Sequence, residues 1–322
     1  MKEAHRGPHQ LRPRPPRHQG PRLHPLLRAC RRLLRRHPPR LSRFHRPPKH
    51  HRRQRRPHPP RGQGRGRGHH RGLTTLDLGR DVRLVREVSR RSGMNIIACT
   101  GMLLDIPRAF WQANVDDIAA LFTREIKEGI EGTGIKAGII KVATDRGGVT
   151  PEGEIILRAA ARAAKKTGVP ISCHTWAPER VGDQQLRIFQ SEKLNLNQVY
   201  IGHSNDTADV AGLMKKSAWV GLDRTFLGDV TPGTRSWTQR AGTIKRLIDA
   251  GWAHRILLGH DWCVYPGIIG PKQQKAFMTH NPDSFLFITR KGLPRLKGLG
   301  VPDKTITQIT VDNPRRFFEN KP

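Results

Sequence analysis

The sequence has little of what marks secreted, disulfide-stapled or membrane-spanning proteins. Its 322 residues hold only four cysteines, Cys30, Cys99, Cys173 and Cys263, and no C-x-x-C pair. A chain of this length needs no disulfide framework, so we expect reduced thiols in a cytoplasmic protein. There is no apolar run of about 18 residues, as a membrane helix requires, and no apolar segment follows the basic start, as in a secretory signal. We therefore expect no membrane partner.

Acidic residues are almost absent from the first 72 positions, where Glu3 is the only one. The same segment holds 23 of the 59 lysines and arginines, 11 of the 16 histidines and 13 of the 25 prolines, so it carries most of the net charge of +33. Its few apolar side chains cannot offset the entropy lost when a chain becomes ordered. The composition predicts a disordered basic tail over residues 1–72 and a folded domain over residues 73–322.

Aromatic and hydroxyl side chains are also scarce in this tail, which contains one aromatic residue, Phe44, and one serine, Ser42. A mitochondrial presequence would be richer in serine. The arginine-rich runs, such as GQGRGRGHHRG, can contact the phosphates of RNA or DNA. Base stacking needs aromatic rings, so we expect the tail to bind nucleic acid only non-specifically.

From residue 73 onward, short apolar strands alternate with amphipathic helical runs. Seven strands are predicted, at residues 74–79, 95–101, 137–144, 170–175, 199–204, 218–224 and 255–261. This alternation over about 250 residues is typical of an α/β protein with a parallel sheet, and the count is one strand short of a closed (β/α)8 TIM barrel. No G-x-G-x-x-G follows the first strand, which argues against a dinucleotide-binding sheet.

Four of these strands carry a chemically active side chain near the C-terminal end, namely Lys141, His174, His203 and Asp261. In a barrel, the C-terminal ends of the strands form the active-site face. Imidazole nitrogens and carboxylate oxygens are zinc ligands, and Asp261 can also accept a proton from an attacking water molecule. The alternatives are a rim lysine, hydrogen-bonded structural histidines and a helix N-cap at Asp261.

Lys141 lies inside the apolar run AGIIKVAT, where burial favours the neutral amine. A neutral lysine can form a Schiff base, as in an aldolase, or react with CO₂ to give a carbamate that bridges metal ions. Arg224 follows the run GLD and can hold an anionic or carbonyl oxygen of a substrate. Its alternative role is a surface salt bridge.

Six motifs in order strongly resemble the phosphotriesterase family of the amidohydrolase superfamily, over roughly residues 73–320: GIKAGIIKVATD, PISCHT, VYIGHSNDT, GLDR, LLGHDW and ITVDNPRRFF. The resemblance implies that Lys141 is carboxylated and bridges two divalent metal ions, usually zinc. It implies that His174, His203 and Asp261 are further metal ligands, that Asp261 is the catalytic proton acceptor, and that Arg224 binds substrate. The implied reaction is hydrolysis of a small-molecule ester, lactone or phosphotriester by a metal-activated hydroxide.

The family's opening H-x-H motif has no counterpart in this sequence. Histidine pairs occur in the tail at residues 50–51 and 69–70, where the arginine-rich surroundings do not suit a buried strand. We therefore expect a barrel that lacks strand 1, one metal ion or none, and weak or absent activity. An out-of-frame reading or a misassigned start would produce such a tail. The runner-up interpretation is an inactive barrel remnant whose tail binds nucleic acid, and a homodimer stays open.

Three local expectations complete the sequence-based picture. Leu103 stands where lactonase-like members of the family commonly place a tyrosine, shortly after a TG pair. The loop from Trp262 to Asn281 is expected to shape substrate specificity. Near the end of the chain, Asn313 is predicted to be the N-cap of a helix with Pro314 at the first helical position.

Overall fold

The computed structural model describes residues 69–206, 209–224, 235–262, 275, 278–279 and 281–321. Most of the predicted tail and most of the loop from Trp262 to Asn281 lie outside these residues. The chain divides between Gln63 and Gly64. The division into a disordered tail over 1–72 and a barrel over 73–322 therefore stays a prediction.

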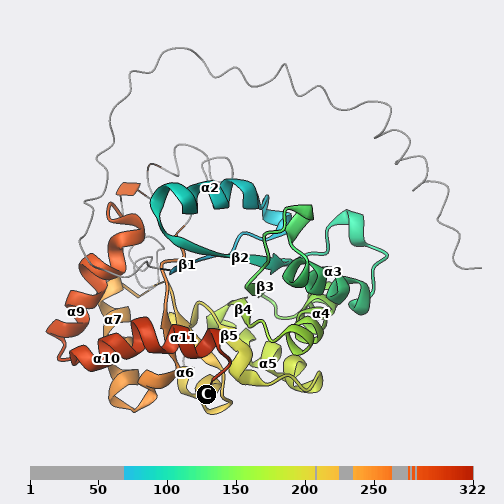
Figure 1. Cartoon of the computed structure of the whole chain (residues 1–322). Coiled ribbons are helices and arrows are strands. Elements are labelled where there is room, and N and C mark those ends of the chain that lie inside the picture. Colours follow the sequence, from blue (N-terminus) through green and yellow to red (C-terminus); the bar gives the residue numbers. More distant parts are fainter. Residues whose placement is uncertain are drawn as a thin grey trace, which may run out of the picture. The chain divides into compact units, whose positions relative to one another are not determined.

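Seven strands form one curled, all-parallel sheet in which the strands follow their order in the chain (Figure 1). The strands are β1 His69–Gly72, β2 Asn95–Gly101, β3 Ile139–Thr144, β4 Ile171–Thr175, β5 Val199–Ile201, β6 Trp219–Leu222 and β7 Ile256–Leu258. Among the described residues, β1 and β7 end the sheet and do not pair with each other. The structure is thus an α/β barrel-like fold that is one strand short, as predicted.

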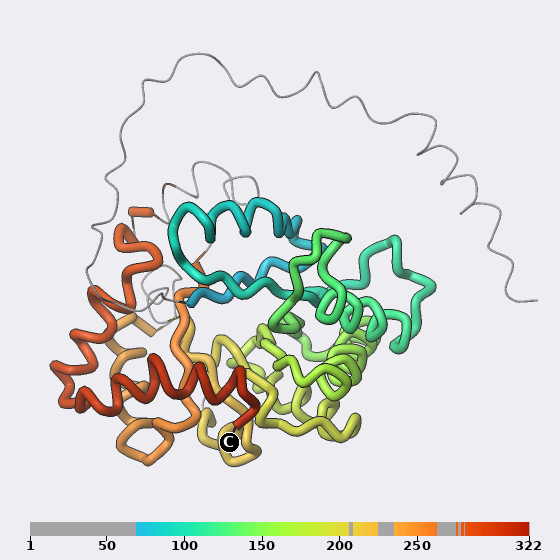
Figure 2. Tube along the Cα trace, viewed as in Figure 1, coloured from blue at the N-terminus to red at the C-terminus, as the bar shows by residue number. Residues whose placement is uncertain are grey.

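Helices connect the strands and surround the sheet, as the trace in Figure 2 also shows. The α-helices are α2 Val82–Ser92, α3 Val115–Lys127, α4 Pro151–Thr167, α5 Val181–Ser191, α6 Val210–Lys215, α7 Trp237–Asp249, α9 Leu293–Gly298, α10 Asp303–Thr307 and α11 Asn313–Phe318. None of the described helices is both long and apolar enough to cross a membrane.

The first strand is displaced from its predicted position. The sequence placed it at residues 74–79, but residues Leu76–Leu78 form a 3₁₀ turn that ends at Gly79 in the left-handed region. The strand lies earlier, at His69–Gly72, inside the segment predicted to be tail, and pairs in register with Asn95 to Ala98 of β2. The backbone of any sequence can make these hydrogen bonds between strands. The apolar pattern of residues 74–79 did not by itself show that this segment pairs with a neighbouring strand.

Alternate side chains of the strands lie on opposite faces of the sheet and pack into two separate hydrophobic clusters. On the outer face of the sheet, Ile140 and Val142 of β3 belong to the large cluster buried under the helices. On the inner face, Ile139 joins a smaller cluster with Tyr200, Trp219 and Phe317. Because strand side chains alternate, Lys141 shares the inner face with Ile139. The sheet therefore presents Lys141 to the barrel interior, although the strand itself is wholly buried.

The predicted N-cap at Asn313 is wrong. Asp312, directly before it, already has helical dihedral angles of φ −72° and ψ −44°, so the helix runs through this point. The side chain of Asn313 instead donates hydrogen bonds to the carbonyl oxygens of Ala253 and Ile256, at 2.7 and 2.8 Å. It ties the last helix to β7, a long-range contact that a local capping pattern cannot reveal.

Candidate metal centre

The four predicted ligands come from four different strands: Lys141 lies in the middle of its strand, and the other three lie near or just beyond the C-terminal ends of theirs. Lys141 is in β3 and His174 is in β4, while His203 follows β5 by two residues and Asp261 follows β7 by three. His203 and Asp261 both adopt left-handed backbone conformations, with φ of 58° and 46°. For residues other than glycine this costs on the order of 1 kcal/mol each, and such strain often accompanies functional sites.

The two imidazole rings and one carboxylate meet at a single place. The ring centroids of His174 and His203 are 4.6 Å apart in an edge-to-face arrangement. Nδ1 of His203 lies 3.8 Å from Oδ2 of Asp261, and Nε2 of His174 lies 3.8 Å from Oδ1 of Asp145. Burial lowers the pKa of His174 to about 4, helped by the positive charges of His203, Lys141 and Arg224. His174 is therefore neutral at pH 7, the form that can donate a lone pair.

Lys141 is buried beneath these groups. Burial lowers the pKa of its ammonium group, and the carboxylates of Asp261 and Asp223 oppose that shift. Desolvation favours the neutral amine, which is the nucleophilic form that carbamate or Schiff-base formation requires.

Arg224 and Asp261 contact each other. Nε of Arg224 donates to Oδ2 of Asp261 at 2.8 Å, and both side chains are partly exposed. The backbone N–H of Arg224 donates to the side chain of Asn205 at 2.9 Å. The predicted substrate-binding residue and the predicted proton acceptor thus form an ion pair, and Asp261 has to exchange this partner before it can bind a cation.

Asp223 is a buried residue of this centre that the sequence reasoning missed. Its Oδ1 accepts the backbone N–H of His203 at 2.9 Å and lies 3.0 Å from Nδ1 of the same residue. Its Oδ2 accepts the hydroxyl of Tyr200 at 2.5 Å. Burial raises the pKa of Asp223, but the charge and hydrogen bonds of His203 and the hydrogen bond from Tyr200 outweigh it and hold the pKa low. Its position directly after β6, like that of Asp261 after β7, was the available signal.

The donors have the chemistry of a divalent-cation site, although they are not assembled into one. Nε2 of His174 is buried and has no hydrogen-bond partner, which is costly unless a ligand satisfies it. Within the described residues, however, no group of three or more histidine, cysteine, aspartate or glutamate side chains is arranged to hold a metal ion. The residue types and the unsatisfied nitrogen fit a cation, provided that Asp261 leaves Arg224.

The described tail histidines do not supply the missing ligands. Nε2 of His69 lies 3.3 Å from the side-chain nitrogen of Asn95. The ring of His70 packs edge-to-face on Phe285, with centroids 5.0 Å apart, and its charge acts on His260. The pair at residues 50–51 lies outside the described residues.

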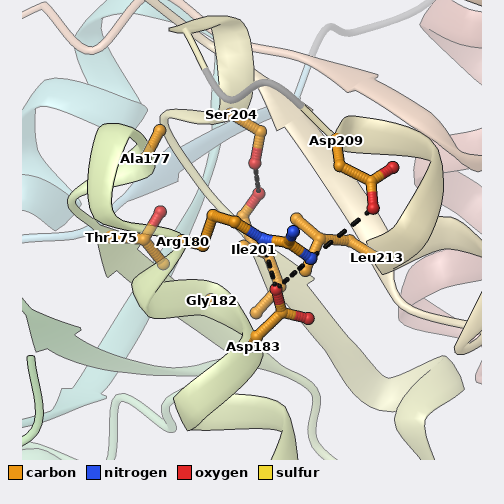
Figure 3. Close-up of a pocket in the computed structure, with 9 residues that line it drawn as sticks. All are labelled: Thr175, Ala177, Arg180, Gly182, Asp183, Ile201, Ser204, Asp209 and Leu213. Atoms are coloured by element: carbon orange, nitrogen blue, oxygen red, sulfur yellow. Dashed lines mark hydrogen bonds and ion pairs between the residues drawn. The ribbon is translucent and has the colours of Figure 1, made fainter.

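A small pocket lies beside this centre, between the ends of β4 and β5 and the first turns of α5 and α6 (Figure 3). Arg180 extends across it and pairs with Asp183 at 2.9 Å and with Asp209 at 3.5 Å. The pocket is lined by Thr175 and Ser204, the residues that follow His174 and His203. Because its charged groups already pair with one another, this pocket supplies no donor to the candidate centre.

A barrel-like α/β fold with histidine, lysine and aspartate on its strands is compatible with several kinds of enzyme, and comparison with known proteins identifies the family. A model of the phosphotriesterase family matches residues 63–318. A phosphotriesterase homology protein of Mycobacterium tuberculosis is 36% identical over 261 residues, which cover 77% of this chain and 78% of the relative. The chain therefore belongs to the phosphotriesterase family.

Two further relatives carry names that describe a hydrolytic activity. An aryldialkylphosphatase of Saccharolobus solfataricus is 36% identical over 252 residues, or 76% of this chain and 78% of the relative. An N-acetyltaurine hydrolase of Dictyostelium discoideum is 27% identical over 260 residues, or 76% of this chain and 67% of the relative. The named relatives are hydrolases, which places this chain in a family of hydrolytic enzymes.

Proposed function

We propose that this protein is a metal-dependent hydrolase that acts on ester-type bonds, either phosphotriesters or lactones. The observation that carries the proposal is the buried, unsatisfied Nε2 of His174, whose ring packs against that of His203. Lys141, His174, His203 and Asp261 would hold the metal, which we propose to be zinc, with Lys141 carboxylated. A bound divalent cation would polarise the substrate's P=O or C=O oxygen and acidify the attacking water.

The chain's own residues have distinct roles in this proposal. Asp261 accepts the proton of the attacking water, because it is the partly exposed carboxylate of the centre. Arg224, once released from Asp261, donates to the anionic or carbonyl oxygen of the substrate. His174 stays neutral at pH 7 because burial lowers its pKa to about 4, so no proton occupies the lone pair that a cation needs. Burial also lowers the pKa of Lys141 and so favours its neutral amine.

Hydrolysis with added zinc tests the proposal. We expect zinc-dependent turnover of lactone and paraoxon-type substrates, at a rate below that of intact relatives because the described residues provide no H-x-H pair. Asp261→Asn should reduce the turnover by at least about a hundredfold, as expected for the loss of a general base. Asp249→Asn, whose carboxylate pairs with Lys245 on the surface of α7, is the matched control and should retain wild-type turnover.

The result that opposes the proposal is a folded protein that hydrolyses none of these substrates at any zinc concentration. N-acetyltaurine, named in one relative, serves as an amide substrate, and a preference for it would overturn the ester assignment. Borohydride trapping of a carbonyl compound on Lys141 without metal would instead support the Schiff-base alternative. Turnover equal to that of intact relatives would contradict only the prediction of weak activity.

A further inference from the structure

Tyr200 extends into the barrel interior directly beneath the candidate centre. It is a fully buried residue of β5, and its hydroxyl donates to Oδ2 of Asp223 at 2.5 Å. The other oxygen of Asp223 accepts from the backbone N–H of His203 and faces Nδ1 of its ring. A hydroxyl, a carboxylate and an imidazole therefore form one continuous hydrogen-bonded chain that ends at a candidate metal ligand.

Two glycines, Gly202 and Gly221, leave the space that the ring of Tyr200 occupies. A Cβ at Gly221 would lie 2.3 Å from both Cζ and Oη of Tyr200. A Cβ at Gly202 would lie 3.2 Å from Cε1 of the same ring and 2.6 Å from the carbonyl oxygen of Cys173. A side chain at Gly221 would displace the ring, and one at Gly202 would clash mainly with the Cys173 carbonyl oxygen and also press on the ring.

The ring of Tyr200 is also fixed from two further directions. The guanidinium carbon of Arg71, in β1, lies 4.7 Å from the ring centroid. Phe317, in α11, packs against the ring with centroids 6.1 Å apart. Contacts from both ends of the described chain thus hold the hydroxyl in one place.

An apolar side chain would fill this interior without bringing a carboxylate into it. Buried charges cost desolvation energy and are often replaceable by apolar residues without loss of stability. The pairing of Tyr200 with Asp223 therefore points to a role beyond stability. The group that the pair contacts is His203.

We propose that Tyr200 is a positioning residue, which acts through Asp223 to hold His203 in the tautomer that carries its proton on Nδ1. A carboxylate accepts only, so Oδ1 of Asp223 selects Nδ1–H and leaves Nε2 as the lone-pair donor. The hydroxyl of Tyr200 fixes Oδ2 and so prevents the carboxylate from rotating toward Arg224, whose charge also acts on it. The tautomer follows from the geometry alone, and only its consequence for catalysis rests on the proposed function.

The test reads the tautomer of His203 directly, by NMR of the ¹⁵N-histidine-labelled full-length chain without metal. His203→Gln identifies the signals of His203. In the wild type, we expect the Nδ1–H form to dominate at neutral pH. In Tyr200→Phe, which keeps the ring and removes the hydroxyl, we expect a mixture of both tautomers and a zinc affinity lowered by about tenfold, measured against a competing chelator.

Thr100→Val is the matched control for Tyr200→Phe. It also removes a buried hydroxyl that donates to a buried carboxylate, here Oε2 of Glu125 at 2.6 Å, but this pair has no contact with His203. We expect Thr100→Val to leave the His203 tautomer and the zinc affinity as in the wild type. A wild-type tautomer in folded Tyr200→Phe would overturn the proposal, as would an equal shift in the control.

Asp223→Ala keeps the test decisive if Tyr200→Phe does not fold. It removes both acceptor oxygens, so we expect His203 to lose its preference for Nδ1–H and to populate both tautomers. An unchanged tautomer in folded Asp223→Ala would overturn the proposal. Because the tautomer is read without zinc or substrate, a failure of the hydrolase proposal remains distinguishable from a failure of this one.

Discussion

His260 and Asp261 are neighbours in the sequence whose surroundings differ sharply. Burial, helped by the charge of His70, lowers the pKa of His260 to about 4, and its ring lies 6.2 Å from that of Phe285. Asp261 instead forms a partly exposed ion pair with Arg224. After β7, the ring of His260 therefore lies beside Phe285, while the carboxylate of Asp261 lies at the candidate centre.

Replacing His260 with glutamine is expected to make folding less sensitive to acid. An unfolded histidine takes up its proton near pH 6.5, whereas folded His260 does so only near pH 4, so the native state loses stability as the pH falls through this window. The loss is on the order of 3 kcal/mol by pH 4. Urea unfolding of the metal-free protein between about pH 7 and pH 4 measures it, and an identical pH dependence in His260→Gln would contradict the assignment.

Sequence patterns predicted the residue types of the candidate centre better than their contacts. Strand periodicity correctly assigned Lys141 and His174 to two successive strands, β3 and β4. It could not show that Arg224 pairs with Asp261, because that contact joins residues 37 positions apart. It also passed over Asp223, whose importance depends on Tyr200 from the neighbouring strand. Such contacts depend on how neighbouring strands pair, which no local pattern encodes.

Among the secondary-structure elements, α3 is joined to the segment just before α2 by a buried ion pair outside the candidate centre. Arg80 donates to both carboxylate oxygens of Glu125 at 2.8 and 2.7 Å, and to the carbonyl oxygen of Cys99 at 3.0 Å. Glu125 also accepts the hydroxyl of Thr100. Both charged side chains are almost fully buried, so each depends on the other for compensation.

Glu125→Gln should be strongly destabilising, because it removes the buried counter-charge of Arg80 and leaves the guanidinium to the more exposed Glu131, 3.2 Å away. Breaking a buried pair from one side typically costs about 3–5 kcal/mol. Glu87→Gln removes a carboxylate of the same kind from the exposed pairs with Arg90 and Arg91 on α2, and should cost little. Urea unfolding compares the two variants, and equal losses would refute the distinction between buried and exposed pairs.

The elements themselves were predictable to differing degrees. Six of the seven strands lie within the predicted segments, because each is an apolar run bounded by turn residues. The first strand was misplaced, since Thr75 to Gly79 alternates like a strand but closes into a turn, in which Asp77 accepts the backbone N–H of Leu103. The actual β1 has no apolar pattern and is defined only by its pairing with β2.

At the scale of the whole chain, two truncations, of residues 1–63 and of residues 1–72, test where the basic segment at the start of the chain ends and the folded domain begins. Removing residues 1–63 should leave the unfolding free energy of the remainder unchanged, because the chain divides between Gln63 and Gly64. Removing residues 1–72 should lower it by about 2–4 kcal/mol, through loss of the ladder between β1 and β2. Urea unfolding of both products tests this, and equal stabilities would show that β1 contributes nothing.

The shorter truncation also tests the proposed nucleic-acid partner. If the arginines of the basic segment contact phosphates, binding of the full chain to DNA of any sequence should weaken steeply as salt rises. The product lacking residues 1–63 should lose most of this binding. Fluorescence anisotropy over a salt series measures the slope, and retained binding after truncation would assign the contacts to the folded part.

The pairing of β1 with β2 shows how little the side chains determine the edge strand of this sheet. The four residues of β1, His-His-Arg-Gly, would not be chosen for a strand by their side chains, yet they adopt the register that the neighbouring backbone offers. An unpaired edge strand can thus pair with an extended neighbouring segment that has no apolar pattern, because the backbone groups that form the ladder are the same in every sequence. A change of side chains in such an edge strand can therefore leave the strand pairing intact while it changes the ligands that the strand offers.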